Sequence, residues 1–142
     1  MKISTKGRYS LRLMLDLATH YEDGPLSLKD ISERQNISKK YLEQIVPLLA
    51  KNGLLTSNRG HMGGYRLAKS PTEISVADVV ECTEGNLHPV SCMTDNSSEC
   101  PQQLECLTLP VWQGLYGVMQ EYLQAISLQD ILDKKCSNKK QL

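Results

Sequence analysis

The sequence has no hydrophobic run long enough to span a membrane, and its N-terminus has no apolar stretch of the length that a signal peptide needs. We therefore expect a cytoplasmic protein without a membrane partner. The chain also has no net charge, because 16 lysine and arginine residues balance 16 aspartate and glutamate residues. Its 142 residues are enough for one domain with a buried core, with or without an added dimerisation arm.

Catalytic and disulfide signals are also missing. No histidine paired with a carboxylate and no nucleophile beside a base can be recognised, so neither an enzyme nor a small-molecule substrate is expected. The five cysteines are an odd number and no secretion signal precedes them, which argues against a disulfide framework. Metal ligation or redox sensing is the expected use of these thiols.

The zero net charge hides an asymmetry between the two halves of the chain. Residues 1–70 hold twelve lysines and arginines against six acidic residues, whereas residues 71–142 hold four against ten. The halves therefore carry +6 and −6. A basic half is the electrostatic signature of phosphate binding, so double-stranded DNA is the expected partner of the first half only.

Residues 38–67 have the pattern of a recognition helix followed by a wing. Ser38 can cap the helix that begins at Lys39, and Gly53 supplies the left-handed conformation that ends it. The apolar stretches 54–56 and 65–67 have strand composition and flank a basic, glycine-rich turn. The sequence predicts a two-stranded hairpin directly after the helix.

A short helix from Ser27 to about Arg34 precedes this stretch, and the three-residue turn 35–37 joins the two helices as a helix-turn-helix motif. In that geometry the second helix enters the major groove. The wing tip is expected to reach a phosphate or a narrow groove. The candidate DNA-binding residues are Ser38, Lys39, Lys40, Tyr41, Glu43 and Gln44 on the helix and Arg59 and His61 on the wing.

Further helices are expected at residues 6–21 and 76–84, the second capped by Ser75 and ended by Gly85. Cys82 lies near the apolar face of the second helix, where a buried, inert thiol is the expected role. Pro47 falls inside the recognition helix. Because proline removes a backbone hydrogen bond, we expect it to kink that helix or end its regular part early.

Apolar residues recur at helical spacing from Leu104 to Ile126 and predict a long helix of about six turns, with Pro110 marking either its start or a kink. Its apolar stripe is larger than one small domain needs. A homodimer seam is expected, because helix-turn-helix proteins read paired half-sites through two-fold symmetry; packing within the chain is the alternative. The stripe comprises Val111, Trp112, Leu115, Val118, Met119 and Tyr122.

The predicted fold is mainly α with a small two-stranded β wing, a winged helix-turn-helix followed by a long C-terminal dimerisation helix. The expected organisation is a DNA-binding region at 1–70 and a connecting helix with a cysteine-bearing loop at 71–103. The dimerisation helix and a short last helix capped by Ser127 occupy 104–133, and a disordered tail occupies 134–142.

Three cysteines, Cys92, Cys100 and Cys106, lie in a polar loop or at the entry to the long helix. We call residues 85–106 the cysteine segment. Three soft thiolates in one segment suit an iron–sulfur cluster or zinc, both of which usually have four ligands. A thiol redox switch has the same signature in sequence, so these alternatives stay open.

Several motifs together resemble the IscR-like family of winged-helix regulators, whose relatives include the nitric oxide sensor NsrR. They are the N-terminal M-K-I-S-T-K-G-R-Y-S-L-R-L-M-L-D-L-A, the run D-I-S-E-R-Q-N-I-S-K-K-Y-L-E-Q, the wing N-G-L-L-T-S-N-R-G-H-M-G-G-Y-R-L, and the three cysteines followed by L-T-L-P-V-W. The similarity extends over about residues 1–132.

This resemblance implies a dimeric transcription regulator, usually a repressor, that binds an iron–sulfur cluster, most often 2Fe-2S, and senses cluster status to control cluster-assembly genes. It implies that Cys92, Cys100 and Cys106 are cluster ligands. Glu43 would tune which operator is accepted, and Arg59 would contact the minor groove.

The fourth ligand differs from the family pattern. The first cysteine gap is two residues longer than in the enterobacterial members, and Leu109 stands where they have histidine. His88 is the nearby histidine candidate. Asp95, Glu99, an acidic residue elsewhere and a ligand from the partner protomer are the alternatives, while Arg8 argues against relatives that use aspartate at the eighth position.

Other interpretations remain. A thiol, zinc or nitric oxide sensor of the same fold is the first alternative, and zinc would leave the protein colourless. An interaction adaptor that does not bind DNA is another. A metalloenzyme or an electron carrier is disfavoured, because neither needs a basic half with a wing. The sequence does not determine cluster type, operator, regulated genes or the roles of Cys82 and Cys136.

Overall fold

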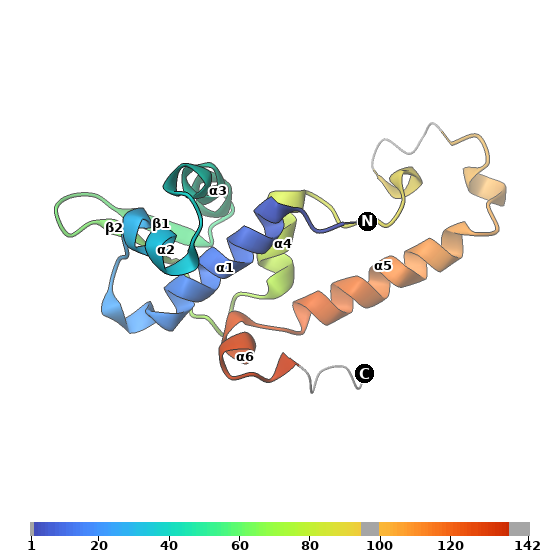
Figure 1. Ribbon diagram of the computed structural model, residues 1–142. Coiled ribbons are helices and arrows are strands. Elements are labelled where there is room, and N and C mark those ends of the chain that lie inside the picture. The colour runs from blue at the N-terminus through green and yellow to red at the C-terminus, as the bar shows by residue number, and fades with distance from the viewer. Residues whose placement is uncertain (1, 95–99, 137–142) are drawn as a thin grey trace.

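The computed structural model describes residues 2–94 and 100–136, and Figure 1 shows a helical body with a wing at one end and a long helix at the other. The predicted mainly α fold with a two-stranded antiparallel sheet is confirmed. No helix within those described ranges is both long and apolar enough to cross a membrane. The elements are α1 (Thr5–Thr19), η1 (Tyr21–Asp23), α2 (Leu28–Gln35), α3 (Lys39–Lys51), β1 (Leu55–Asn58), β2 (Gly64–Leu67), α4 (Val76–Glu84), η2 (Ser91–Met93), η4 (Gln103–Glu105), α5 (Leu109–Gln124) and α6 (Leu128–Leu132).

One apolar core joins the first four helices to the wing. Helix α1 supplies four of its buried side chains, and α2, α3, both ends of the hairpin, α4 and α6 close around them. Burying such side chains is the main stabilising term of the fold, and it holds α3 against α1. The fully buried members are Leu13, Met14, Ile31, Leu42, Ile45, Leu49, Ile74, Leu128 and Val79.

A buried carboxylate fixes the angle between α1 and α2. Asp16 receives a hydrogen bond from Arg34 Nη2 at 2.7 Å and one from Gln35 Nε2 at 2.9 Å. Burial by itself would raise the pKa of Asp16, but the hydrogen bonds from Arg34 and Gln35, with the charges of Arg34 and His20, outweigh it and lower that pKa. The carboxylate therefore stays ionised and ties the end of α2 to α1.

The turn between α2 and α3 follows the predicted capping chemistry. Asn36 ends α2 in the left-handed conformation with φ 54°, and the Ser38 side chain accepts a hydrogen bond from the Tyr41 amide at 3.1 Å. The expected early end of the recognition helix at Pro47 is wrong, because α3 runs on to Lys51. Pro47 lies on the exposed side, where the carbonyl that it leaves without an amide can face water.

The wing is held by a third stretch of chain. In the hairpin Leu55 pairs with Leu67 and Asn58 with Gly64. Leu26 adds a short bridge to Tyr65, with N–H···O distances of 2.8 Å in both directions. The segment between α1 and α2 thus anchors the second strand, and the wing keeps a fixed position beside α3.

Gly64→Ala is expected to destabilise the protein by about 1–3 kcal/mol, because a Cβ at this position would overlap the backbone of Leu26. Backbone atoms cannot rotate away, so the bridge to Tyr65 should be lost. Urea unfolding followed by circular dichroism measures the change. Ser57→Ala, at an exposed position on β1, is the control and should change little. Equal stability of the Gly64 variant and wild type would show that the wing has no such close contact.

The C-terminal half closes back on the body through two similar corners. Ser75 and Ser127 each begin a helix with a reciprocal capping box, to Asp78 and Asp130 respectively. The two serines also pair as an antiparallel bridge. The predicted starts of both helices are confirmed, and the bridge positions the end of α5 near the start of α4.

The long helix is shorter than predicted. It begins at Leu109 rather than Leu104, so Pro110 marks its start and not a kink within it. The preceding residues form the short turn η4, and Cys106 is extended with φ −72° and ψ 109°. Of the expected tail, only Lys134, Lys135 and Cys136 belong to the described residues, and 137–142 lie outside them.

Candidate nucleic-acid interface and cysteine segment

The first turns of α3 present a polar, exposed surface. Glu43 and Gln44 are exposed one turn beyond the capping serine. Tyr41 is half-buried, with its ring 5.4 Å from that of Tyr9 in an edge-on contact, so it anchors α3 to α1 as well as bordering this surface. The exposed predicted residues are Ser38, Lys39, Lys40, Glu43 and Gln44, and all five are brought together on one helix.

The charge of Glu43 is only weakly compensated. Lys39 Nζ lies 4.0 Å from Glu43 Oε1, and both side chains are more than half exposed. A pair this open contributes little to stability. Glu43 therefore keeps a negative charge in the middle of a surface whose other charges are the two lysines, Lys39 and Lys40.

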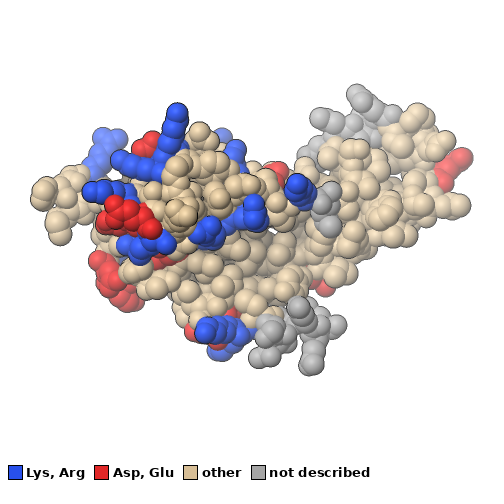
Figure 2. All heavy atoms as spheres, viewed as in Figure 1, with Lys and Arg blue, Asp and Glu red and all other residues tan. Residues whose placement is uncertain are grey.

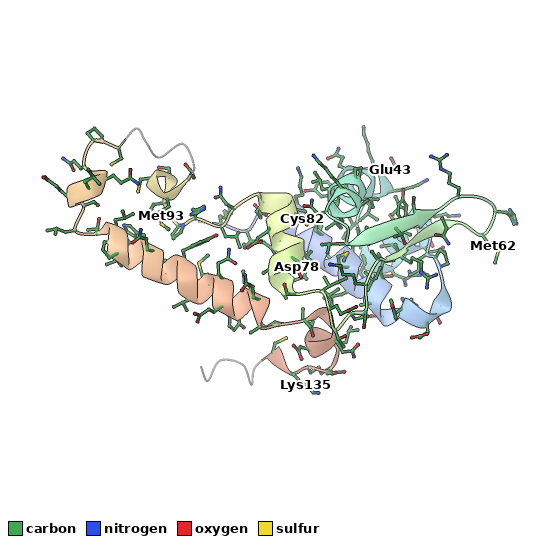
Figure 3. All side chains as sticks on the ribbon, turned by 180° about the vertical axis from the view of Figure 1, so that it is seen from behind. Glu43, Met62, Asp78, Cys82, Met93 and Lys135 are labelled. Atoms are coloured by element: carbon green, nitrogen blue, oxygen red, sulfur yellow. The ribbon has the colours of Figure 1, made fainter. Side chains whose placement is uncertain are left out.

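The wing tip carries the other predicted contacts. Arg59 and His61 are exposed at the end of the hairpin, which projects beyond α3 (Figure 3). In Figure 2 the lysine and arginine side chains gather around the wing, α2 and α3, whereas the α5 end has few. The structure thus shows the charge asymmetry of the sequence as two different surfaces.

The cysteine segment lies at the far end of α5 from the wing (Figure 1). Cys92 is in η2, and Cys106 follows η4 directly before α5. All three cysteines of the segment are half-buried free thiols. The segment begins where α4 ends at Glu84, so it connects a helix of the core to the helix that projects from it.

The thiols differ in their tendency to ionise. The pKa of Cys106 is lowered, first by a hydrogen bond with the Thr108 side chain, 3.4 Å away, and then by the amides of Thr108 and Leu109 at the start of α5. In contrast, burial, together with the charges of Asp78 and Glu81, raises the pKa of Cys82. Cys82 packs against the main core, which agrees with its predicted inert role.

The described side chains are not arranged as a metal site. Within residues 2–94 and 100–136, no three histidine, cysteine, aspartate or glutamate side chains lie close enough together to hold a metal ion. Asp95 and Glu99, two of the predicted alternatives for a fourth ligand, lie outside the described residues. Arg8, which stands at the eighth position where some relatives use an aspartate ligand, donates a hydrogen bond to the Thr5 hydroxyl at 3.2 Å.

His88, the predicted histidine candidate, is stacked on Tyr116 of α5 with ring centroids 4.5 Å apart. Its Nδ1 atom is buried, with no hydrogen-bond partner among the residues that the structure describes. A buried imidazole nitrogen without a partner is available to a ligand. By type, three thiols and this nitrogen fit a soft metal, although the thiols are not gathered around it.

Two polar contacts that support the interface were not predicted. One is the Asp16–Arg34 pair. The other joins Glu84 to the start of α1, where Glu84 Oε1 accepts from the Ser4 hydroxyl at 2.5 Å and from the Ser4 amide at 2.9 Å. The sequence did contain one signal for these contacts, because a serine such as Ser4 directly before an apolar helical stripe is a typical helix cap. The long-range partners in both contacts depend on tertiary packing and have no signal in the sequence.

Comparison with known proteins agrees with this arrangement. The profile of the Rrf2 family, described as "Iron-dependent Transcriptional regulator", matches residues 3–134. The "HTH-type transcriptional regulator IscR" of Photorhabdus laumondii is 40% identical over 135 residues, which are 95% of this chain and 81% of that protein.

Solved structures show the same similarity. "CymR (YrzC) the Global Cysteine Regulator of B. subtilis" has a TM-score of 0.77 and 38% identity, covering 94% of this chain and 98% of that one. "T. potens IscR" has a TM-score of 0.75 and 37% identity, covering 100% and 92%. The curated relatives and these structures are transcription regulators and not enzymes. This chain, with its exposed recognition helix and wing, belongs to the Rrf2 family of iron-dependent, DNA-binding transcriptional regulators.

Proposed function

We propose that this protein is a dimeric repressor that senses iron–sulfur cluster status and controls genes for cluster assembly. The observation that carries the proposal is the match of an iron-dependent regulator family over residues 3–134, because that range holds both α3 and the three cysteines of the cysteine segment. The IscR relatives, similar over nearly the whole chain, support it.

DNA binding on this proposal uses the surface formed by α3 and the wing. Lys39 and Lys40 attract phosphates, a contribution that weakens as salt rises. Gln44 and Glu43 face base edges in the major groove, where a carboxylate can accept from a cytosine amine and is repelled elsewhere. Arg59 and His61 reach the neighbouring minor groove or its phosphates.

Dimerisation is supported by the two faces of α5. Tyr116, Met119, Tyr122 and Leu123 pack against a second small core in the same chain. The adjoining side of the helix carries Val111, Leu115 and Val118, with exposures of 61%, 38% and 66%. An apolar face of this kind on a projecting helix fits a second copy of the same helix, since paired half-sites require two α3 helices.

The cluster ligands on this proposal are Cys92, Cys100 and Cys106, with His88 as the fourth ligand in the same segment. Soft thiolates are the ligands that iron–sulfur clusters use, and the lowered pKa of Cys106 favours the ligating thiolate form. A bound 2Fe-2S cluster would supply iron–thiolate bonds between parts of the segment. The chain's own contribution is to attach that segment directly to α4 and α5.

The experiment compares wild type with a variant in which Cys92, Cys100 and Cys106 are all alanine. Anaerobically purified wild type should contain iron and sulfide and absorb visible light, and the variant should lose all three signals while keeping its helical circular dichroism. Affinity for the DNA upstream of its own gene should also change. Cys136→Ala, a thiol outside the segment, is the matched control and should behave as wild type. Wild type without iron and sulfide after anaerobic reconstitution would refute the cluster.

A thiol, zinc or nitric oxide sensor is the second candidate function. One observation favours the thiol sensor among these: the lowered pKa of Cys106, which increases the fraction of reactive thiolate. The similarity to a protein titled as a global cysteine regulator agrees with it. Zinc without iron, or operator affinity that responds to a thiol oxidant in iron-free protein, would identify this alternative.

A further inference from the structure

An apolar side chain lies unprotected at the tip of the wing. Met62 is 85% exposed, and Figure 3 places it at the outer end of the hairpin, beyond the rest of the body. The other large, markedly exposed apolar residues belong to the region around α5, apart from Ile3 at 38%. Single exposed apolar residues are common on proteins, so the position of Met62, and not its exposure alone, is what matters.

The backbone under Met62 is closely packed. Gly60 has φ +106°, and the Gly63 amide donates to the Gly60 carbonyl at 3.0 Å, which closes a tight turn around His61 and Met62. A Cβ at Gly63 would overlap the Asn58 carbonyl oxygen. The turn therefore presents Met62 from a defined backbone, so less conformational entropy is lost when the side chain binds something.

Basic side chains share the wing with this thioether. Arg59 and His61 are exposed in the same turn, and Arg66 is exposed on β2. A methionine at the tip of such a wing is poorly suited to a phosphate, with which an apolar side chain forms no hydrogen bond. It is well suited to the DNA minor groove, where an arginine meets the negative potential and an apolar side chain can press between stacked base pairs.

The fold brings the tip to that groove. Strand β1 follows α3 closely and packs against it, and the Leu26–Tyr65 bridge fixes β2 from the other side. When α3 lies in a major groove, a hairpin held beside it extends toward the adjacent minor groove. Figure 3 shows Met62 on the outer turn of this hairpin.

We propose that Met62 is a minor-groove wedge that inserts against a base step next to the site of Arg59 and helps to select operators by their deformability. Flexible pyrimidine–purine steps such as TA and CA would be favoured at that position, because they unstack at lower cost. This inference rests on the proposed operator binding and adds a contact that reads DNA shape and not hydrogen-bonding groups.

The test uses full-length protein and the DNA upstream of its own gene, with Met62→Ala and the apolar control Met62→Leu. Met62→Ala should weaken binding about tenfold, or ~1.4 kcal/mol, and reduce the DNA bend measured by end-to-end energy transfer. Its salt dependence should match wild type. Met62→Leu should retain affinity and bend, whereas Arg59→Ala should lower the salt dependence.

A fluorescent base analogue, 2-aminopurine, placed at successive steps of the minor groove locates the contact. Its emission should rise at one step with wild type and Met62→Leu and stay low with Met62→Ala. Wild-type affinity and bending by Met62→Ala would overturn the wedge and leave operator binding itself intact. Failure of the wild type to bind the fragment would instead count against the proposed function.

Discussion

Replacing Asp16 with alanine is expected to lower the free energy of unfolding by about 3 kcal/mol, the low end of what losing one partner of a buried ion pair costs. Asp16 is 4% exposed and bonded to Arg34 and Gln35. Without the carboxylate, the Arg34 guanidinium loses its bonded partner and keeps only the smaller Coulombic attraction of Asp30. Because the Arg34 side chain is 36% exposed, water can solvate part of it, which keeps the loss at that low end.

Urea unfolding at a fixed protein concentration measures this loss. The pKa of Asp16 is lowered in the folded state, so its contribution is present above the unfolded pKa of about 3.9 and disappears as pH falls through the folded value. The difference between wild type and Asp16→Ala should therefore be full at pH 7 and shrink below about pH 4. Glu43→Ala, which removes the open pair with Lys39, is the control and should change stability by less than about 0.5 kcal/mol. A pH-independent difference would contradict an ionised Asp16.

The helix starts were predictable because capping is local chemistry. Ser27, Ser38, Ser75 and Ser127 each accept a hydrogen bond from an amide three residues later, as serine before an apolar helical stripe predicts. The wing was predictable for a similar reason. Its glycines are required by close backbone approaches within a few residues and by the bridge to Leu26.

The start of α5 was mispredicted because periodicity records spacing and not backbone conformation. Leu104 and Leu107 fit the helical period of the residues that follow, but both are exposed, Leu104 in the short turn η4 and Leu107 between that turn and α5. The Asp16–Arg34 contact could not be read from sequence either. It joins residues 18 positions apart on two helices, so their approach depends on how the core packs.

The candidate site was predicted unevenly for the same physical reason. Five of the six α3 residues are exposed together because one helix sets their spacing, while Tyr41 turns toward Tyr9. Ligands in an irregular segment have no such fixed spacing. Their three-dimensional arrangement depends on whatever the segment binds, and the sequence defines only which donor atoms are available.

Val118→Glu is expected to convert the proposed dimer to monomers and to weaken operator binding by about 10²–10⁴-fold. Val118 is 66% exposed on the side of α5 next to Met119, which packs within the chain. In a two-fold symmetric seam the substitution introduces two carboxylates, one per protomer, into an apolar contact. Burying them without partners is unfavourable. Each monomer would then bind only one half-site. In a dimer bound at one half-site, the second recognition helix meets the other half-site at a high effective concentration, and the monomer lacks this advantage.

Sedimentation equilibrium gives the oligomeric state, and binding to fragments with one or two half-sites separates loss of dimerisation from loss of DNA contacts. Val118→Glu should bind a single half-site as well as wild type does, because α5, which carries Val118, projects from the body on the side away from the wing (Figure 1). Gln113→Glu adds the same charge at an exposed position that the helical repeat turns away from Val118, and it should remain dimeric. If both variants stay dimeric, the apolar face of α5 is not the seam. If Val118→Glu is monomeric but binds the full operator as wild type does, paired half-site recognition is wrong.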